Sequence, residues 1–125
     1  MTKFLSDDFF SELQTALAGD AQWVESTKGV KTSVLLSVKE TGSSHLISVD
    51  GGAITIQKVE PGAPAEFSFE GTYDAWVKVA KGEMDMQSAV LKGQLKFKGS
   101  ITKVLMYRDR FLRIAELLKG LQKEF

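Results

Sequence analysis

The sequence has no cysteine, one histidine and two prolines among its 125 residues. The absence of cysteine excludes disulfides, thiolate metal sites and cysteine nucleophiles. A single histidine, His45, argues against a zinc site, which usually takes several imidazole or thiolate ligands. No apolar run approaches the ~20 residues of a membrane-spanning helix, and the first residues lack the apolar core of a signal peptide. We therefore expect a cytoplasmic protein with no cofactor, no metal and no stable membrane insertion.

An excess of charge of either sign is also missing. Sixteen Lys and Arg residues balance sixteen Asp and Glu residues, so no global field attracts nucleic acid or an acidic membrane. Lys96 and Lys98 are expected on the solvated outer face of a strand, with Phe97 pointing the other way, which does not suit a nucleic-acid surface. A chain of this length is most simply one domain, covering residues 1–125.

Residues arranged for catalysis are not evident. His45 lies near a turn, where we expect a surface or strand-end position, and no hydroxyl is spaced to form a nucleophile pair with it. Asp7 and Asp85 lie at expected helix starts, where a carboxylate is structurally favourable. The segment Asp50-Gly51-Gly52 precedes a strand, so it predicts a tight hairpin rather than a phosphate site. We expect no catalytic residue and no enzyme.

Hydrophobic periodicity predicts an α+β protein. The expected helices begin at or near Ser6, Asp20, Thr72, Asp85 and Ser100. The expected strands lie near residues 33–39, 46–49, 54–57, 66–70 and 94–99. The strands have one apolar face, so we expect a single five-stranded, mostly antiparallel sheet covered on one face by about five helices. The first four strands are expected to form a meander.

The stretch from Phe67 to Gly99 resembles a known family. An aromatic strand is followed by Asp74-Ala75-Trp76, then by Lys81-Gly82, and then by Gly93-Gln94-Leu95-Lys96-Phe97-Lys98-Gly99. This order is similar to the sterol-carrier-protein domain family, in which a Trp-bearing helix follows a strand and a G-x-(L/I)-x-(F/V)-x-G strand leads into the last helix. The rest of the chain, from near Phe4 onward, follows a similar element order.

The resemblance implies a hydrophobic tunnel between the sheet and the helices. Domains of this family bind sterols, fatty acids or fatty-acyl derivatives there, which implies non-catalytic binding and intracellular transfer of such a lipid. The last helix is expected to close one end of the tunnel. The ligand-binding residues that the resemblance implies are Leu36, Val38, Ile47, Val49, Ile56, Phe67, Phe69, Trp76, Met84, Met86, Leu105 and Phe111.

Two other interpretations stay open. In the first, the core is filled and the apolar stripe of the last helix, ending at Leu121 and Phe125, forms a homodimer or docks on a partner enzyme. Domains of the resembled family also occur behind alkyl-sulfatase catalytic domains. The second is a small enzyme like the steroid isomerases, which suits apolar ligands. Helices at both ends of the chain, and no apolar-flanked Asp in a strand, weigh against it.

Overall fold

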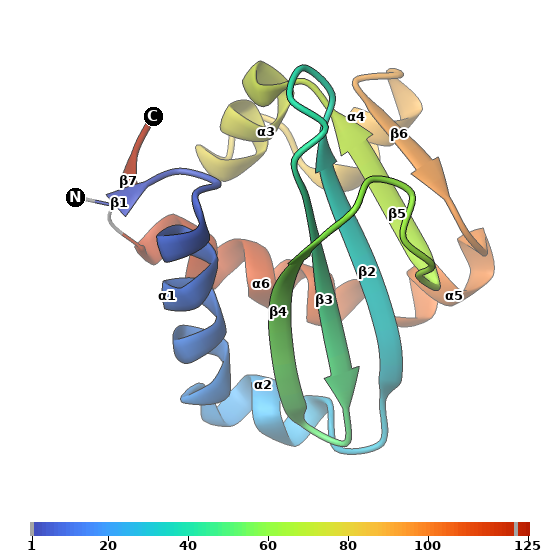
Figure 1. Cartoon of the computed structure of the whole chain (residues 1–125). Helices are drawn as coiled ribbons and strands as arrows, with labels where there is room; N and C mark the ends of the chain where they lie inside the picture. Colours follow the sequence, from blue (N-terminus) through green and yellow to red (C-terminus); the bar gives the residue numbers. More distant parts are fainter. Residues whose placement is uncertain (1, 122) are drawn as a thin grey trace.

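The computed structural model describes residues 2–121 and 123–125, and its main sheet has five strands with helices packed against one face (Figure 1). The strands of this sheet are β2 (Lys31–Val38), β3 (Ser44–Asp50), β4 (Ala53–Val59), β5 (Phe67–Gly71) and β6 (Leu95–Lys98). The helices are α1 (Asp7–Ala18), α2 (Ala21–Ser26), α3 (Tyr73–Ala80), α4 (Met86–Leu91), α5 (Ile101–Met106) and α6 (Arg108–Gly120). The predicted α+β class and the mostly antiparallel five-stranded sheet are confirmed.

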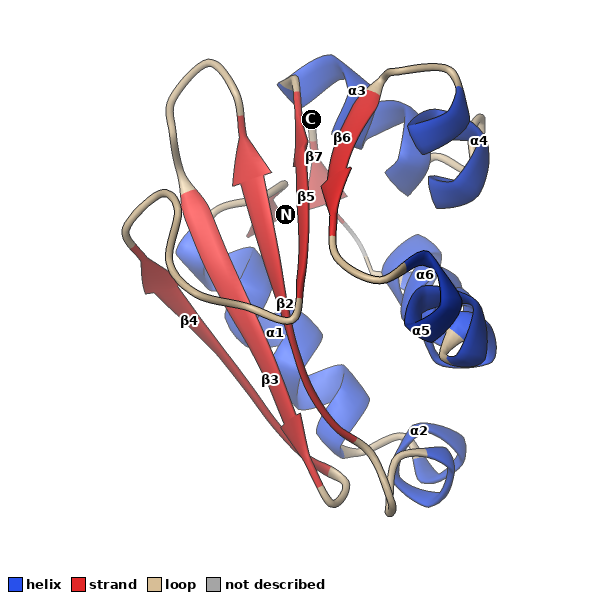
Figure 2. Cartoon of the chain, turned by 90° about the vertical axis from the view of Figure 1, so that its right-hand side faces the viewer, coloured by secondary structure: helices blue, strands red, loops and turns tan. Residues whose placement is uncertain are grey.

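The strand order β4-β3-β2-β5-β6 differs from the expected meander of four strands, which is therefore wrong. The meander ends at β4, and β5 pairs in parallel with β2. The segment 60–66 reaches β5 by crossing the sheet on the face away from α1 (Figure 2). There the backbone N–H of Glu66 donates to Ser33 Oγ at 2.9 Å. This crossing explains why Leu35, which shares the outer face with Ser33, is only 3% exposed.

Side chains at the five expected helix starts do form caps. The side chains of Ser6, Asp20, Thr72, Asp85 and Ser100 each accept a hydrogen bond from the backbone N–H three residues later. Such a cap satisfies a donor that has no partner inside the helix and contributes about 1 kcal/mol. These five helix starts therefore follow from local sequence.

The expected last helix is divided in two. Tyr107, with φ −96° and ψ 12°, separates α5 from α6, and its ring makes an edge contact with Phe67 on the sheet. The chain ends also meet, because β1 (Thr2–Lys3) pairs in parallel with β7 (Lys123–Glu124). The end of α6 is thus fastened beside the start of α1.

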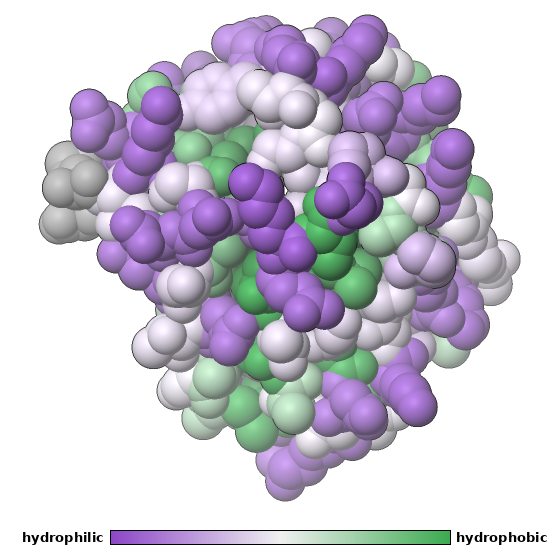
Figure 3. Space-filling view, viewed as in Figure 1, coloured by the Kyte–Doolittle hydropathy of each residue, from purple (hydrophilic) through white to green (hydrophobic). Residues whose placement is uncertain are grey.

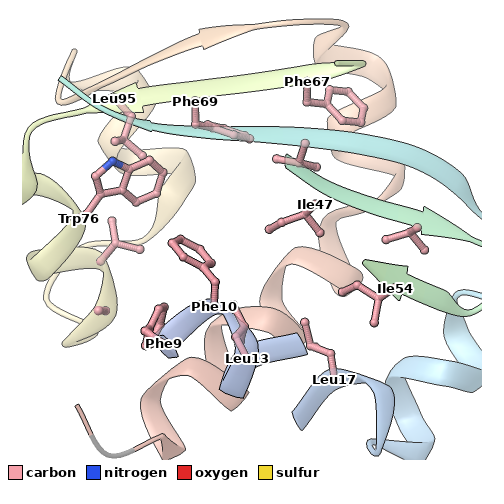
Figure 4. Packing of buried hydrophobic residues seen from close by; sticks show 14 of the residues in the cluster. Phe9, Phe10, Leu13, Leu17, Ile47, Ile54, Phe67, Phe69, Trp76 and Leu95 are labelled. Carbon is pink, nitrogen blue, oxygen red and sulfur yellow. The ribbon is translucent and has the colours of Figure 1, made fainter. Parts of the chain in front are cut away.

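The buried core lies mainly between the sheet, α1 and α3 (Figure 4). Phe9, Phe10, Leu13 and Leu17 of α1 face apolar side chains of the sheet, and each such burial stabilises the fold by about 1.5–3 kcal/mol. By contrast, α6 has no fully buried residue. Of the two longest helices, α1 and α6, it is therefore α6 that packs less deeply against the sheet.

Candidate functional site

An apolar cavity of about 80 Å³ lies between the sheet and α6. Its floor comes from the inner faces of β2, β3 and β5, and its sides come from α1 and α3. The side chains of Phe111, Ile114, Ala115 and Leu118 on α6 form its cover. Every side chain that lines it among the described residues is apolar. A cavity with such walls stays dry and favours apolar ligands.

A second cavity, of about 20 Å³, lies beneath the first turn of α6 and beside α2. It shares Val34, Ile47, Phe111 and Ile114 with the larger cavity. These four side chains therefore divide one apolar space into two parts. Because Phe111 belongs to α6, any movement of that helix changes the division.

Six of the twelve expected ligand-binding residues meet at the larger cavity: Leu36, Ile47, Phe69, Trp76, Met86 and Phe111. One more, Val49, lines the smaller cavity. Four line neither cavity: Phe67 belongs to the buried core, and Val38, Ile56 and Met84 pack against it. Leu105 lies on α5, is 53% exposed and lines neither cavity.

Sequence reasoning did not assign α1 to the site. Phe9, Phe10 and Leu13 line the larger cavity, although their helical spacing indicated only that they are buried. That spacing fixes which face of α1 points inward, but it does not tell whether the facing space is filled. The residues of α6 that cover the cavity could have been found from the same stripe that holds Phe111.

Two arginines hold α6 against α2. The guanidinium of Arg113 donates to both carboxylate oxygens of Asp20, with an Nε–Oδ2 distance of 2.9 Å. The hydrogen bond from Arg113 holds the pKa of the Asp20 carboxyl below its usual value. One turn earlier, Arg110 Nε donates to the carbonyl oxygen of Ser26 at 3.1 Å. The cover of the cavity is thus fastened by charge and hydrogen bonds rather than by deep burial.

His45 lies on the inner face of β3 and is only 4% exposed, so it is not at the surface. Its ring stacks on Phe10 with 3.9 Å between centroids. Its Nε2 is 3.0 Å from Asp7 Oδ1, and this hydrogen bond lowers the pKa of the Asp7 carboxyl. His45 therefore positions Phe10, which lines the cavity. Asp7 is its hydrogen-bond partner among the described residues, and no hydroxyl serves as one.

The one face of the molecule drawn in Figure 3 gives little sign of another site. The face seen in Figure 3 is mainly polar, with apolar surface in small separate patches. Within residues 2–121 and 123–125, His, Asp and Glu side chains form no group of three suited to a metal ion. In the same part of the chain, the helices are too short or too polar to cross a bilayer.

Comparisons with known proteins point to one family. The model of the SCP-2 sterol transfer family matches residues 12–111. Sterol carrier protein 2 of Arabidopsis thaliana is 31% identical over 106 residues, which cover 81% of this chain and 85% of the relative. A crystal structure of sterol carrier protein 2 superposes with a TM-score of 0.83 at 19% identity, covering 96% of this chain and 100% of the other.

A solution structure from Thermus thermophilus shows the same fold. It is that of a conserved hypothetical protein described as a candidate sterol carrier protein. It also has a TM-score of 0.83, at 18% identity, and covers 99% of this chain and 93% of its own.

Proposed function

The chain belongs to the SCP-2 sterol transfer family, and we propose that it binds one hydrophobic ligand between the sheet and α6 and carries it without catalysis. Family membership indicates lipid binding or transfer. The ligand class that we propose is a fatty acid, a fatty-acyl derivative or a sterol-like lipid. The observation that carries this proposal is the wholly apolar cavity beneath a helix that buries no residue completely.

The present cavities are too small for such a ligand. A cavity of about 150 Å³ holds benzene, whereas the two cavities here measure about 80 and 20 Å³. We therefore propose that α6 moves outward when a ligand binds and that the described arrangement is the closed one. Moving α6 costs less than moving α1, because α1 carries four buried side chains and α6 carries none.

The expected gain from binding is large enough to open the cavity. Each buried methylene contributes about 0.8 kcal/mol, so a sixteen-carbon chain gains on the order of 12 kcal/mol. Loss of ligand freedom and ordering of side chains remove several kcal/mol of this. Micromolar affinity needs about 8 kcal/mol, so these losses and the displacement of α6 together must cost no more than about 4 kcal/mol. No polar contact is required for binding of this strength.

The test is a substitution on α6 that fills part of the larger cavity. Ala115 lines the larger cavity from α6, whereas Leu112 is exposed on the same helix. We expect Ala115→Phe to weaken palmitate binding by at least about tenfold, since excluding two methylenes already costs that much. Leu112→Phe is the matched control and should leave binding unchanged. Titration of a fluorescent fatty acid measures both variants, and native mass spectrometry of the purified protein reports any bound lipid.

A folded Ala115→Phe variant with wild-type affinity would place the ligand elsewhere. A wild-type protein that carries no lipid and binds no fatty acid or sterol would reject the carrier proposal altogether.

A second candidate function is a docking module with a filled core. It is favoured by the exposed apolar side chains of Ile101, Leu105 and Met106 on α5. In that case the protein would bind no lipid and would form a homodimer or a complex, which sedimentation at high concentration would detect.

A further inference from the structure

The charge of the chain is balanced overall but not along its length. Residues 92–112 contain six Lys and Arg residues and one acidic residue, Asp109, so this segment carries a net charge of +5. The remainder of the chain therefore carries −5. The segment includes β6 and α5, which lie with α4 on one side of the molecule (Figure 1 and Figure 2). Its basic residues are thus gathered on one side of a protein that is neutral as a whole.

The same segment holds most of the exposed apolar side chains. Ile101, Leu105 and Met106 of α5 are 53–65% exposed. Ile101 and Leu105 are one helical turn apart, so they lie on the same face of the helix. Among the described residues six large apolar side chains are exposed, and four belong to this segment: Ile101, Leu105, Met106 and Leu112. Apolar side chains gathered on one surface mark an interaction site.

The other side of α5 is fixed to the sheet. Val104 of α5 and Tyr107, which follows the helix, pack against the hydrophobic core. Lys103 Nζ donates to Glu66 Oε2 at 2.8 Å, just before β5 begins. These contacts hold the helix in place and leave its three exposed apolar side chains outside. The surface that they form is therefore present before any partner binds.

Two cations without a carboxylate partner flank α5 along the chain. Lys98 is the last residue of β6, and Arg108 is the first residue of α6. Both are exposed, and neither forms a salt bridge in the described part of the chain. Lys103 and Lys96 differ, because each lies beside a glutamate at β5. Lys98 and Arg108 are therefore free to bind an external anion.

We infer that α5 docks on the surface of an anionic lipid membrane. Its three exposed apolar side chains enter the interface, while Lys98 and Arg108 contact the lipid head groups. Apolar side chains next to cations hold protein segments at such surfaces, where either signal alone binds weakly. Because α6 follows α5 directly, docking also brings the cover of the larger cavity close to the lipid. This inference adds a partner to the proposed function and does not depend on it.

The charges favour a membrane at α5 over other surfaces and partners. The long helix α1 carries Asp7, Asp8 and Glu12 and no basic residue, so an anionic membrane repels it. A symmetric dimer through α5 would place identical surfaces face to face, and the cations of the two copies would repel each other. Single-stranded nucleic acid stacks its bases on aromatic rings, whereas the three exposed apolar side chains of α5 are not aromatic.

The experiment measures binding to phosphatidylcholine vesicles with and without phosphatidylserine, by vesicle flotation. We expect the wild-type protein to bind the vesicles that contain phosphatidylserine, and the binding to weaken as salt screens the charges. The double variant Lys98→Gln and Arg108→Gln should bind them roughly tenfold to thirtyfold more weakly. The matched control is Lys39→Gln with Lys58→Gln, since both lysines are exposed and β4, which holds Lys58, lies at the opposite edge of the sheet from β6. This control should stay within about twofold of wild type.

A second pair of variants tests the apolar contact. Met106 is 65% exposed, so its replacement removes little packing from the folded protein. We expect Met106→Ser to weaken binding to the anionic vesicles by roughly threefold to tenfold, because less apolar surface enters the interface. Met106→Leu keeps an apolar side chain of similar size and should bind as wild type does.

A wild-type protein that does not bind anionic vesicles would overturn the inference, even if it binds fatty acid. Equal weakening in the Lys39 and Lys58 control would overturn it as well, because the attraction would then not belong to α5. A dimer in sedimentation that Met106→Ser dissociates would show that α5 contacts a second copy instead. Vesicle binding by a protein that takes up no fatty acid or sterol would support the inference and reject the proposed function, so the two failures are distinguishable.

Discussion

At the scale of single residues, Gly99 fixes the connection between β6 and α5. Its φ of +137° is one that L side chains rarely adopt. A Cβ built on it would lie 2.9 Å from the carbonyl oxygen of Glu66 and 2.9 Å from Phe67 Cδ1. Phe67 is the fully buried first residue of β5 and Glu66 directly precedes it, so they cannot easily move away. The turn that brings α5 and then α6 over the cavity thus depends on a glycine.

We expect Gly99→Ala to lower the free energy of unfolding by roughly 1–3 kcal/mol, since it combines backbone strain with a close contact to backbone. Gly29→Ala is the matched control, because a Cβ there would meet nothing within 4 Å and its φ is not positive. The control should change stability by less than about 1 kcal/mol. Urea unfolding measures both variants, and equal losses would contradict this account of Gly99.

Some residue roles could be predicted from the sequence and others could not. Ser6 and Thr72 were predicted as caps because a cap involves only a residue and the backbone three positions later. Arg110 and Trp23 were not predicted to line the same cavity. They are 87 positions apart in the printed sequence, and they meet only because α2 and α6 pack on the same end of the sheet. No local pattern contains that information.

At the scale of elements, the pairing of Asp20 with Arg113 ties α6 to α2. The folded protein holds the pKa of Asp20 below its usual value. The stability gained from this shift is therefore present above the pKa of about 3.9 that an unfolded aspartate has. It is lost as the pH falls through the lower pKa of the folded state. The attachment of α6 should accordingly weaken in acid.

Asp20→Asn tests this attachment, because asparagine is also a good helix cap and keeps that role in α2. We expect the variant to have a lower Tm than wild type at pH 7, and the difference to shrink toward pH 2. Thermal denaturation between pH 2 and 7 measures it. Glu25→Gln is the control, since Glu25 and Lys28 form an exposed pair that contributes little. Equal Tm values for Asp20→Asn and wild type across this pH range would show that Asp20 acts only as a cap.

The positions of the strands and helices along the sequence were predicted more accurately than their arrangement in space. Alternating apolar residues located all five strands of the sheet, but alternation within a strand does not say which strand lies beside it. The parallel neighbour of β2 is β5, and the long crossing by 60–66 leaves no periodic signal. The break at Tyr107 was missed for a related reason, because its contact with Phe67 is made across the fold.

At the scale of the whole molecule, the two chain ends close the structure over the larger cavity. The backbone N–H of Phe4 donates to the carbonyl oxygen of Glu124 at 2.8 Å. The rings of Phe4 and Phe125 lie 5.1 Å apart, and Phe4 itself lines the larger cavity. Lys123 Nζ donates to the carbonyl oxygen of Leu118 on α6 at 2.8 Å. The final residues therefore hold the far end of α6, opposite the end that Arg113 holds.

Deleting residues 123–125 should free that end while leaving the core between α1, α3 and the sheet intact. We expect release of a bound fluorescent fatty acid to become roughly tenfold faster, because losing about 1.4 kcal/mol of closing free energy changes the opening rate by that factor. Stopped-flow displacement by excess palmitate measures the rate. Phe125→Ala keeps the pairing of β7 with β1 and should show a smaller increase. A folded deletion variant that releases ligand at the wild-type rate would mean that α6 opens only at its α2 end, where the arginines hold it.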